Sequence, residues 1–166
     1  MAKWAKFDFS ELRRLAGAFN KALDDRVIER FMRDFLLEMA FRAERKIKKR
    51  TPVNTGHLRE NWKVGRVERH GNALVVEIYN PVDYASFVEY GFRSHWVPGY
   101  WKGKSFVYDP NAETGMYVGP KDGWVPGRFM ATISMQEIER ELPRYLERRV
   151  MELWDGIMNG RPPRKG

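Results

Sequence analysis

Cysteine is absent from this sequence of 166 residues, and histidine is scarce, with three copies. A chain without cysteine forms no disulfide, no thiolate zinc site and no cysteine nucleophile. A reducing, cytosolic environment is the simplest interpretation of that absence. The histidines lie far apart in turn-like segments, at His57, His70 and His95, without the paired spacing of a metal site. We therefore expect them to be exposed turn residues.

Long apolar runs are also missing. The apolar stretches are far shorter than the roughly 18 residues that a membrane-spanning helix needs, and the first ten residues lack the apolar core of a signal peptide. Phosphate-binding glycine loops and the serine-hydrolase elbow do not occur. No nucleophile is paired with a base. We therefore predict a protein that is not an enzyme, with no catalytic residue, no cofactor, no metal and no membrane partner.

Negative charge is in deficit, because 30 Lys and Arg residues face 22 Asp and Glu residues and leave a net charge of +8. One cationic cluster lies at 42–50 and another in the last residues, 161–165. Such clusters fit an anionic partner such as nucleic acid. Cations at the C-terminal end of a helix are also favoured by the helix dipole, by about 0.3–1 kcal/mol each. The sequence leaves both interpretations open.

A helical pattern runs from Ser10 to about Arg50. From Leu23 to Ile47 an apolar residue recurs every four positions, and each such step turns the stripe by about 40° around the helix. The stripe therefore turns farther than one flat core face can use. Either the helix breaks near Asp24–Asp25, or part of the stripe packs on another subunit. The candidate interface residues on this helix are Ile28, Met32 and Leu36.

The middle of the chain alternates in the manner of a β-hairpin. Residues 61–69 and 73–79 alternate apolar and polar side chains around a turn at 70–72. Asp83 is placed to cap a short helix over 84–90, which Gly91 ends by taking a positive φ. Long helices on either side of a hairpin indicate the α+β class.

Residues 92–123 show no helical period and carry many aromatic rings. Segments 105–108 and 115–118 are expected to pair as a hairpin, and the repeated Trp-Val-Pro-Gly at 96–99 and 124–127 suggests two turns. The rings suit base stacking on single-stranded nucleic acid or packing on a neighbouring subunit, which we favour. The candidate interface residues in this insertion are Trp96, Tyr100, Trp101, Phe106 and Tyr108.

The last helix is predicted to begin at Ser134, because Ser134 and Glu137 match a capping box. Its apolar stripe reaches Ile157, and Pro143 within it predicts a kink or a restart. The complete prediction is a single α+β domain over 1–166, with long N-terminal and C-terminal helices on a small antiparallel sheet. The core covers about 8–91 and 124–158, the extended aromatic insertion 92–123, and the basic C-terminal tail 159–166.

Three ordered blocks stand out, at residues 51–62 (TPVNTGHLRENW), 80–91 (NPVDYASFVEYG) and 124–130 (WVPGRFM). Together they resemble the small tail-component family of long-tailed bacteriophages. The insertion between the second and third blocks is longer than that family leads us to expect. The residues that carry the resemblance are Pro52, Thr55, Gly56, Leu58, Arg59, Trp62, Pro81, Tyr84, Ala85, Val88, Glu89, Gly91, Trp124, Pro126, Gly127, Arg128, Phe129 and Met130.

The resemblance implies a structural virion protein at the phage neck or the head-proximal end of the tail, acting in tail completion or head–tail joining. It implies a ring around the DNA channel, sixfold as a first guess and twelvefold as a second. Its expected partners are copies of itself, the head-closure or connector protein, and the tail terminator or tail tube, with genomic DNA only passing through. The expected location is the virion, after assembly in the host cytoplasm.

Two alternative functions remain at this stage. One is a tail terminator that caps the tail tube, and the other is a basic nucleic-acid-binding module. Within the motif blocks we expect the prolines and glycines to shape turns, and Leu58, Trp62, Tyr84, Phe87, Val88, Phe129 and Met130 to pack. We also expect Glu89 to form an ion pair with Arg59 or Arg128.

Overall fold

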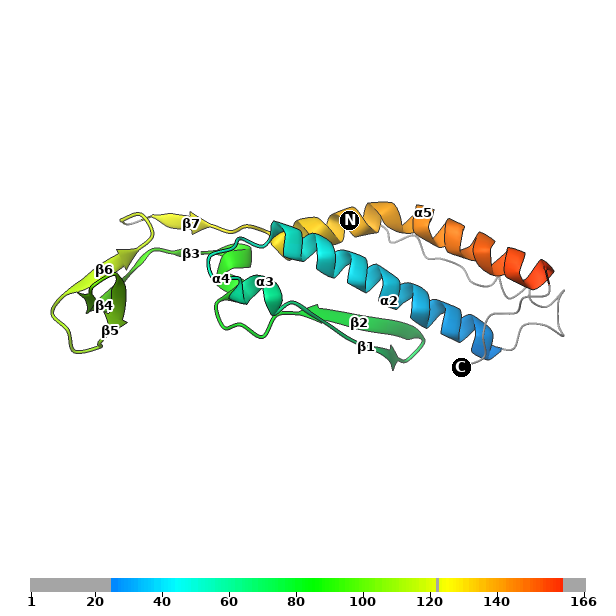
Figure 1. Cartoon of the computed structure of the whole chain (residues 1–166), viewed down its shortest axis with the longest axis horizontal. Coiled ribbons are helices and arrows are strands. Elements are labelled where there is room, and N and C mark those ends of the chain that lie inside the picture. Colours follow the sequence, from blue (N-terminus) through cyan, green and yellow to red (C-terminus); the bar gives the residue numbers. More distant parts are fainter. Residues whose placement is uncertain (1–24, 122, 160–166) are drawn as a thin grey trace. The chain divides into compact units, whose positions relative to one another are not determined.

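A computed structural model describes residues 25–121 and 123–159. It contains helices and small antiparallel sheets (Figure 1), so the α+β class predicted from the sequence is confirmed. The chain divides into two units. Among the described residues, the first unit contains 25–42, 64–77 and 138–159, and the second contains 43–63, 78–121 and 123–137. The expected helix start at Ser10 and most of the basic tail lie outside the described residues.

The first unit contains most of helix α2 (Asp25–Arg50), the hairpin of β1 (Lys63–His70) and β2 (Ala73–Tyr79), and the later part of helix α5 (Met130–Met158). Its core joins Phe31, Phe35 and Met39 of α2 to Leu146 of α5. The rings of Phe31 and Phe35 stack with centroids 6.4 Å apart. The four-residue spacing of these α2 side chains places them on one face of the helix.

Contacts from α2 also hold the β-hairpin. Arg33 donates a hydrogen bond of 2.9 Å from Nη1 to the carbonyl oxygen of Val67. Arg69 on β1 forms an ion pair of 3.0 Å with Glu29 on α2. The hairpin matches the predicted one closely, because its alternating residues and its turn at Gly71, which has a φ of 61°, are local features.

The second unit contains the end of α2, α3 (His57–Glu60), α4 (Ala85–Tyr90) and the start of α5. Its core gathers Ile47, Leu58, Trp62 and Met130 from four separate segments. The turning stripe of α2 therefore serves two cores of the same chain. Phe31, Phe35 and Met39 belong to the first core and Ile47 to the second.

Five short strands complete the second unit. Strands β3 (Gly91–Arg93) and β7 (Trp124–Pro126) pair antiparallel. Strand β4 (His95–Lys102) lies between β5 (Ser105–Tyr108) and β6 (Gly115–Val118), antiparallel to both. The predicted pairing of 105–108 with 115–118 is therefore wrong, although both segments are strands. Each of them pairs with β4, part of which the Pro-Gly motif had predicted to be a turn.

Two further local predictions are wrong. The motif at 96–99 lies within β4, and 124–126 forms β7, so neither is the expected Pro-Gly turn. Helix α5 begins at Met130 instead of Ser134 and continues through Pro143 without a restart. An unbroken helix through proline gives up one backbone hydrogen bond, and Pro143 lies on the exposed surface of α5.

Candidate functional site

The first motif block begins by anchoring itself to the end of α2. Thr51, which is buried, donates from Oγ1 to the carbonyl oxygen of Ile47 at 2.8 Å. The same Oγ1 accepts a hydrogen bond of 3.0 Å from Nε1 of Trp62, and Arg59 donates to the carbonyl oxygen of Thr51 at 3.1 Å. One threonine therefore fixes the helix end, the indole and the guanidinium.

The second block is attached to the first through Asn80. Its side-chain Nδ2 donates to the carbonyl oxygen of Leu58 at 2.8 Å, and its Oδ1 accepts from the backbone N–H of Val82 at 3.1 Å. Val82 and Val88 then pack against the buried cluster that contains Leu58. An asparagine that accepts from the residue two positions ahead forms a side-chain turn, which here holds the second block beside the first.

The third block is joined to the second by the carboxylate of Glu89. This side chain is 6% exposed. One oxygen accepts a 2.9 Å hydrogen bond from the backbone N–H of Ala131, and the other accepts from the N–H and Oγ1 of Thr132, at 2.9 and 2.8 Å. Glu89 therefore caps the first turn of α5, where unpaired N–H groups and the helix dipole favour an anion.

The ion pair that we expected between Glu89 and an arginine is wrong. Both carboxylate oxygens bind the start of α5, and among the described residues neither Arg59 nor Arg128 forms an ion pair with Glu89. Arg128 instead donates its backbone N–H to the carbonyl oxygen of Val88 at 2.8 Å. A helix N-terminus provides hydrogen-bond donors to a buried carboxylate without burying a second charge. Its desolvation penalty is therefore lower than that of a buried pair with an arginine.

Two motif glycines lie where the second and third blocks cross. A Cβ atom at Gly91 would overlap the carbonyl oxygen of Val125, and one at Gly127 would overlap that of Glu89. Gly91 also has the predicted positive φ, at 85°. The close approach of the two backbones explains why both positions are glycine.

The remaining motif residues divide between core and surface. Leu58, Trp62 and Met130 are buried, and Ala85 and Val88 pack against them. Tyr84, Phe87 and Phe129, which we expected to pack, are largely exposed. Gly56 is half-buried with a φ of 85°, while Pro52, Thr55, Pro81, Trp124 and Pro126 are exposed. The three blocks thus build a buried centre, while several of their apolar side chains remain exposed.

The candidate interface residues occupy two different settings. On α2, Ile28 is buried, and Met32 and Leu36 are half-buried, with Met32 packed against the first core. In the insertion, Phe106 is half-buried. The other four rings there are exposed, namely Trp96, Tyr100, Trp101 and Tyr108. The insertion therefore offers more uncovered apolar surface than α2 does.

A charged cluster that the sequence analysis missed surrounds Glu137 on α5. Lys46 forms an ion pair of 3.1 Å with it, Arg50 binds its other oxygen, and Arg50 also donates to Oγ of Ser134 at 3.2 Å. The hydrogen bond from Lys46, together with the nearby charge of Arg50, holds the pKa of Glu137 below its usual 4.5. Ser134 and Glu137 therefore bind α2 instead of capping α5.

The cationic end of α2 is largely compensated within the chain. Besides Lys46 and Arg50, Arg42 pairs with Glu38 at 2.8 Å, and Lys48 pairs with Glu44 at 2.8 Å. The guanidinium of Arg42 also lies 4.2 Å from the ring centroid of Tyr145. Cations that already hold carboxylates are less available to phosphate groups, which weakens the nucleic-acid interpretation of this cluster.

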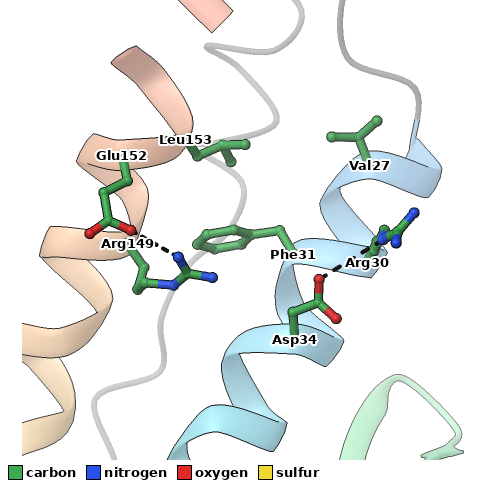
Figure 2. A pocket seen from close by; sticks show the side chains of 7 residues that line it. All are labelled: Val27, Arg30, Phe31, Asp34, Arg149, Glu152 and Leu153. Atoms are coloured by element: carbon green, nitrogen blue, oxygen red, sulfur yellow. Dashed lines mark hydrogen bonds and ion pairs between the residues drawn. The ribbon is translucent and has the colours of Figure 1, made fainter. Parts of the chain in front are cut away.

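The first unit has a hollow between α2 and α5 that resembles no active site. Figure 2 shows its apolar residues, including Phe31 and Leu153, beside two ion pairs. Arg30 pairs with Asp34 at 3.9 Å on α2, and Arg149 pairs with Glu152 at 2.8 Å on α5. Each of these charges has a partner on its own helix, so the lining residues do not set a nucleophile beside an unpaired base.

The other chemical signals are equally sparse in the part of the chain that is described. Across residues 25–121 and 123–159, no group of three or more His, Asp or Glu side chains is arranged to hold a metal ion. The same ranges contain no helix that is both long and apolar enough to cross a membrane. His57, His70 and His95 are exposed, as the sequence predicted, but they lie at the ends of α3, β1 and β4 and not in turns.

Comparison with known proteins gives two curated relatives, both from Bacillus subtilis (strain 168). The phage-like element PBSX protein XkdI is 42% identical over 59 residues, which cover 32% of this chain and 35% of XkdI. The uncharacterized protein YqbI is 32% identical over 90 residues, which cover 48% of this chain and 53% of YqbI. The chain thus spans between about a third and about half of their lengths. No solved structure matches significantly.

The family comparison matches residues 13–91, which contain the first and second blocks. The matching family is described as "Bacteriophage HK97-gp10, putative tail-component". The third block lies outside the matched range. The resemblance to the small tail-component family is confirmed, because residues 13–91, slightly less than half of the chain, match the family of HK97 gp10-like phage tail components.

Proposed function

We propose that the chain is a structural virion protein at the phage neck or the head-proximal end of the tail, where it completes the tail and joins it to the head. It works as an oligomeric ring around the DNA channel, sixfold or twelvefold. The observation that carries this proposal is the match of residues 13–91 to phage tail components. The relation to a protein of the phage-like element PBSX supports it.

The geometry supports a structural role over a catalytic one. The polar motif residues Thr51, Asn80 and Glu89 join segments of the chain through hydrogen bonds. None of these contacts sets a nucleophile beside a base. The same centre presents exposed aromatic side chains at Tyr84 and Phe87. A rigid centre with an apolar surface suits protein–protein contact.

The proposed partners are further copies of the chain, a head-closure or connector protein on one side, and a tail terminator or tail tube on the other. Genomic DNA passes through the channel without being gripped. The pairing of Lys46 and Arg50 with Glu137 agrees with a surface that does not hold phosphate. The proposed location is the virion, after assembly in the host cytoplasm.

The direct test removes the chain from the phage or phage-like element that encodes it and images the particles by negative stain. Separate heads and tails of normal length are expected, because the joining component is missing. Restoring the gene in trans should restore joined particles. Overlong tails would favour the tail terminator instead, and normal joined particles would contradict the proposal.

A further inference from the structure

The strands β5, β4 and β6 form a small sheet, here called the arm, that covers His95–Val118. None of its described residues belongs to either buried cluster. It carries five exposed rings, at Trp96, Tyr100, Trp101, Tyr108 and Tyr117. A small sheet needs a hydrophobic face or a helix packed on it to be stable, and large exposed apolar patches often mark interaction sites.

A second uncovered apolar surface lies over the first two motif blocks. It is a groove between the turn at 52–57 and the start of α4, here called the motif groove, and its apolar residues include Val53, Leu58, Tyr84 and Val88. Val53 and Tyr84 are 54% and 44% exposed. The groove is therefore a concave apolar surface, whereas the arm is a sheet with exposed rings.

The charges at the β4–β5 end of the arm and those beside the groove have opposite signs. Lys102 is the last residue of β4, and Lys104 lies in the turn that leads to β5. The Glu60 carboxylate lies beside Gly56 in the groove, where a Cβ would be 3.3 Å from it, and Asp83 directly precedes Tyr84. Within residues 25–121 and 123–159, none of these four side chains has a hydrogen-bond or ion-pair partner.

We propose that the arm of one copy docks in the motif groove of the next copy. The rings around Trp101 then cover Val53 and Tyr84, and the lysines of the arm face Glu60 and Asp83. This inference rests on the proposed ring. Two different surfaces that fit each other give a head-to-tail contact, which closes into a ring when its rotation allows. Opposite charges at the rim would set the orientation of docking.

The first experiment uses the absence of cysteine from the chain. A double variant, Tyr84→Cys with Trp101→Cys, is oxidised in purified protein and in particles. If the arm reaches the next groove, each copy links to two others, so a non-reducing gel shows a ladder of covalent multimers. The single variants should give dimers at most. The matched control is Tyr84→Cys with Tyr79→Cys, since Tyr79 is also exposed but lies on β2.

A ladder from the arm–groove pair, several-fold stronger than that of the control pair, supports the proposal. Particles that contain the double variant but yield no ladder would overturn it. So would a cross-link within one copy, or one from the arm to another virion protein. Joined particles that contain none of the chain would instead refute the proposed function, so the two failures are distinguishable.

The second experiment reverses the charges. Lys102→Glu with Lys104→Glu should lower the fraction of the chain in oligomers several-fold, as measured by light scattering. Glu60→Lys with Asp83→Lys should lower it to a similar extent. Combining all four changes should restore assembly, because opposite charges face each other again. Lys63→Glu, an exposed change on β1, is the control and should leave assembly unchanged. Failure of the combined variant to recover, with circular dichroism unchanged, would contradict the docking.

Discussion

Two tryptophans of the second unit show how differently its regions use the same side chain. Trp62 is 7% exposed, packs with Ile47, Leu58 and Met130, and donates to Thr51. Trp101 on the arm is 59% exposed, and its ring contact is the edge of Phe106, with centroids 5.4 Å apart. The first ring holds the chain together. The second is available for contact with a partner. A change at Trp62 should therefore affect folding, and a change at Trp101 should affect assembly.

The largest effect is expected from Trp62→Ala. It removes a buried indole and the hydrogen bond to Thr51, so the free energy of unfolding should fall by about 3–5 kcal/mol. Urea denaturation followed by circular dichroism measures this loss. A fall below about 1 kcal/mol would mean that the centre built by the motif blocks is not a core.

A smaller loss is expected from Glu89→Ala, which leaves the first N–H groups of α5 without their acceptor. The free energy of unfolding should fall by about 2–3 kcal/mol, since hydrogen bonds to a charged group are among the stronger ones. Glu89→Gln keeps one acceptor oxygen and should lose less. Arg128→Ala is the control for the rejected ion pair and should change stability by less than about 0.5 kcal/mol. Equal losses in the free energy of unfolding for Glu89→Ala and Arg128→Ala would instead support an ion pair between Glu89 and Arg128.

The third effect depends on pH. Lys46 and Arg50 lower the pKa of Glu137 in the folded chain, so the folded state releases this proton more readily than the unfolded state does. The stabilisation is therefore present above the ordinary pKa of 4.5 and is lost as the pH falls through the lowered value. Between pH 7 and pH 3, the thermal midpoint of Glu137→Gln should fall less than that of the unchanged protein. Parallel curves for the two proteins would show that the cluster does not stabilise the fold.

The smallest effect on folding is expected from Trp101→Ala. The side chain is exposed, so the free energy of unfolding should change by about 1 kcal/mol or less, mostly from the lost contact with Phe106. Trp101→Ala should nevertheless strongly reduce the assembly of copies of the chain into oligomers. A loss of stability as great as that of Trp62→Ala would remove the distinction between the two rings.

The features that the sequence predicted well are local ones. The hairpin of β1 and β2 and the short helix α4 follow from alternation, turn residues and a terminating glycine within a few positions. The predicted cap of α4 is wrong, because Tyr84 and not Asp83 is its N-cap residue and no side chain caps it. Long-range features were less accessible. Ser134 and Glu137 form a capping-box pattern, yet they are one turn apart on a helix face that binds Arg50. The pattern alone cannot separate these two uses.

The centre of the candidate site was predicted in composition but not in its contacts. The blocks identified Leu58, Trp62 and Met130, which are buried together. The partner of Glu89 was missed, because it depends on where α5 begins, and that start depends in turn on Glu89. The position of β4 between β5 and β6 was not predicted either. Its Pro-Gly pair is typical of a turn and not of a strand interior.

The arm is expected to serve assembly instead of folding. The most direct test is to image particles that carry only the Trp101→Ala chain. The purified variant must first show an unfolding midpoint close to that of the unchanged protein. We then expect separate heads and tails in place of joined particles. Joined particles in normal numbers would contradict the claim.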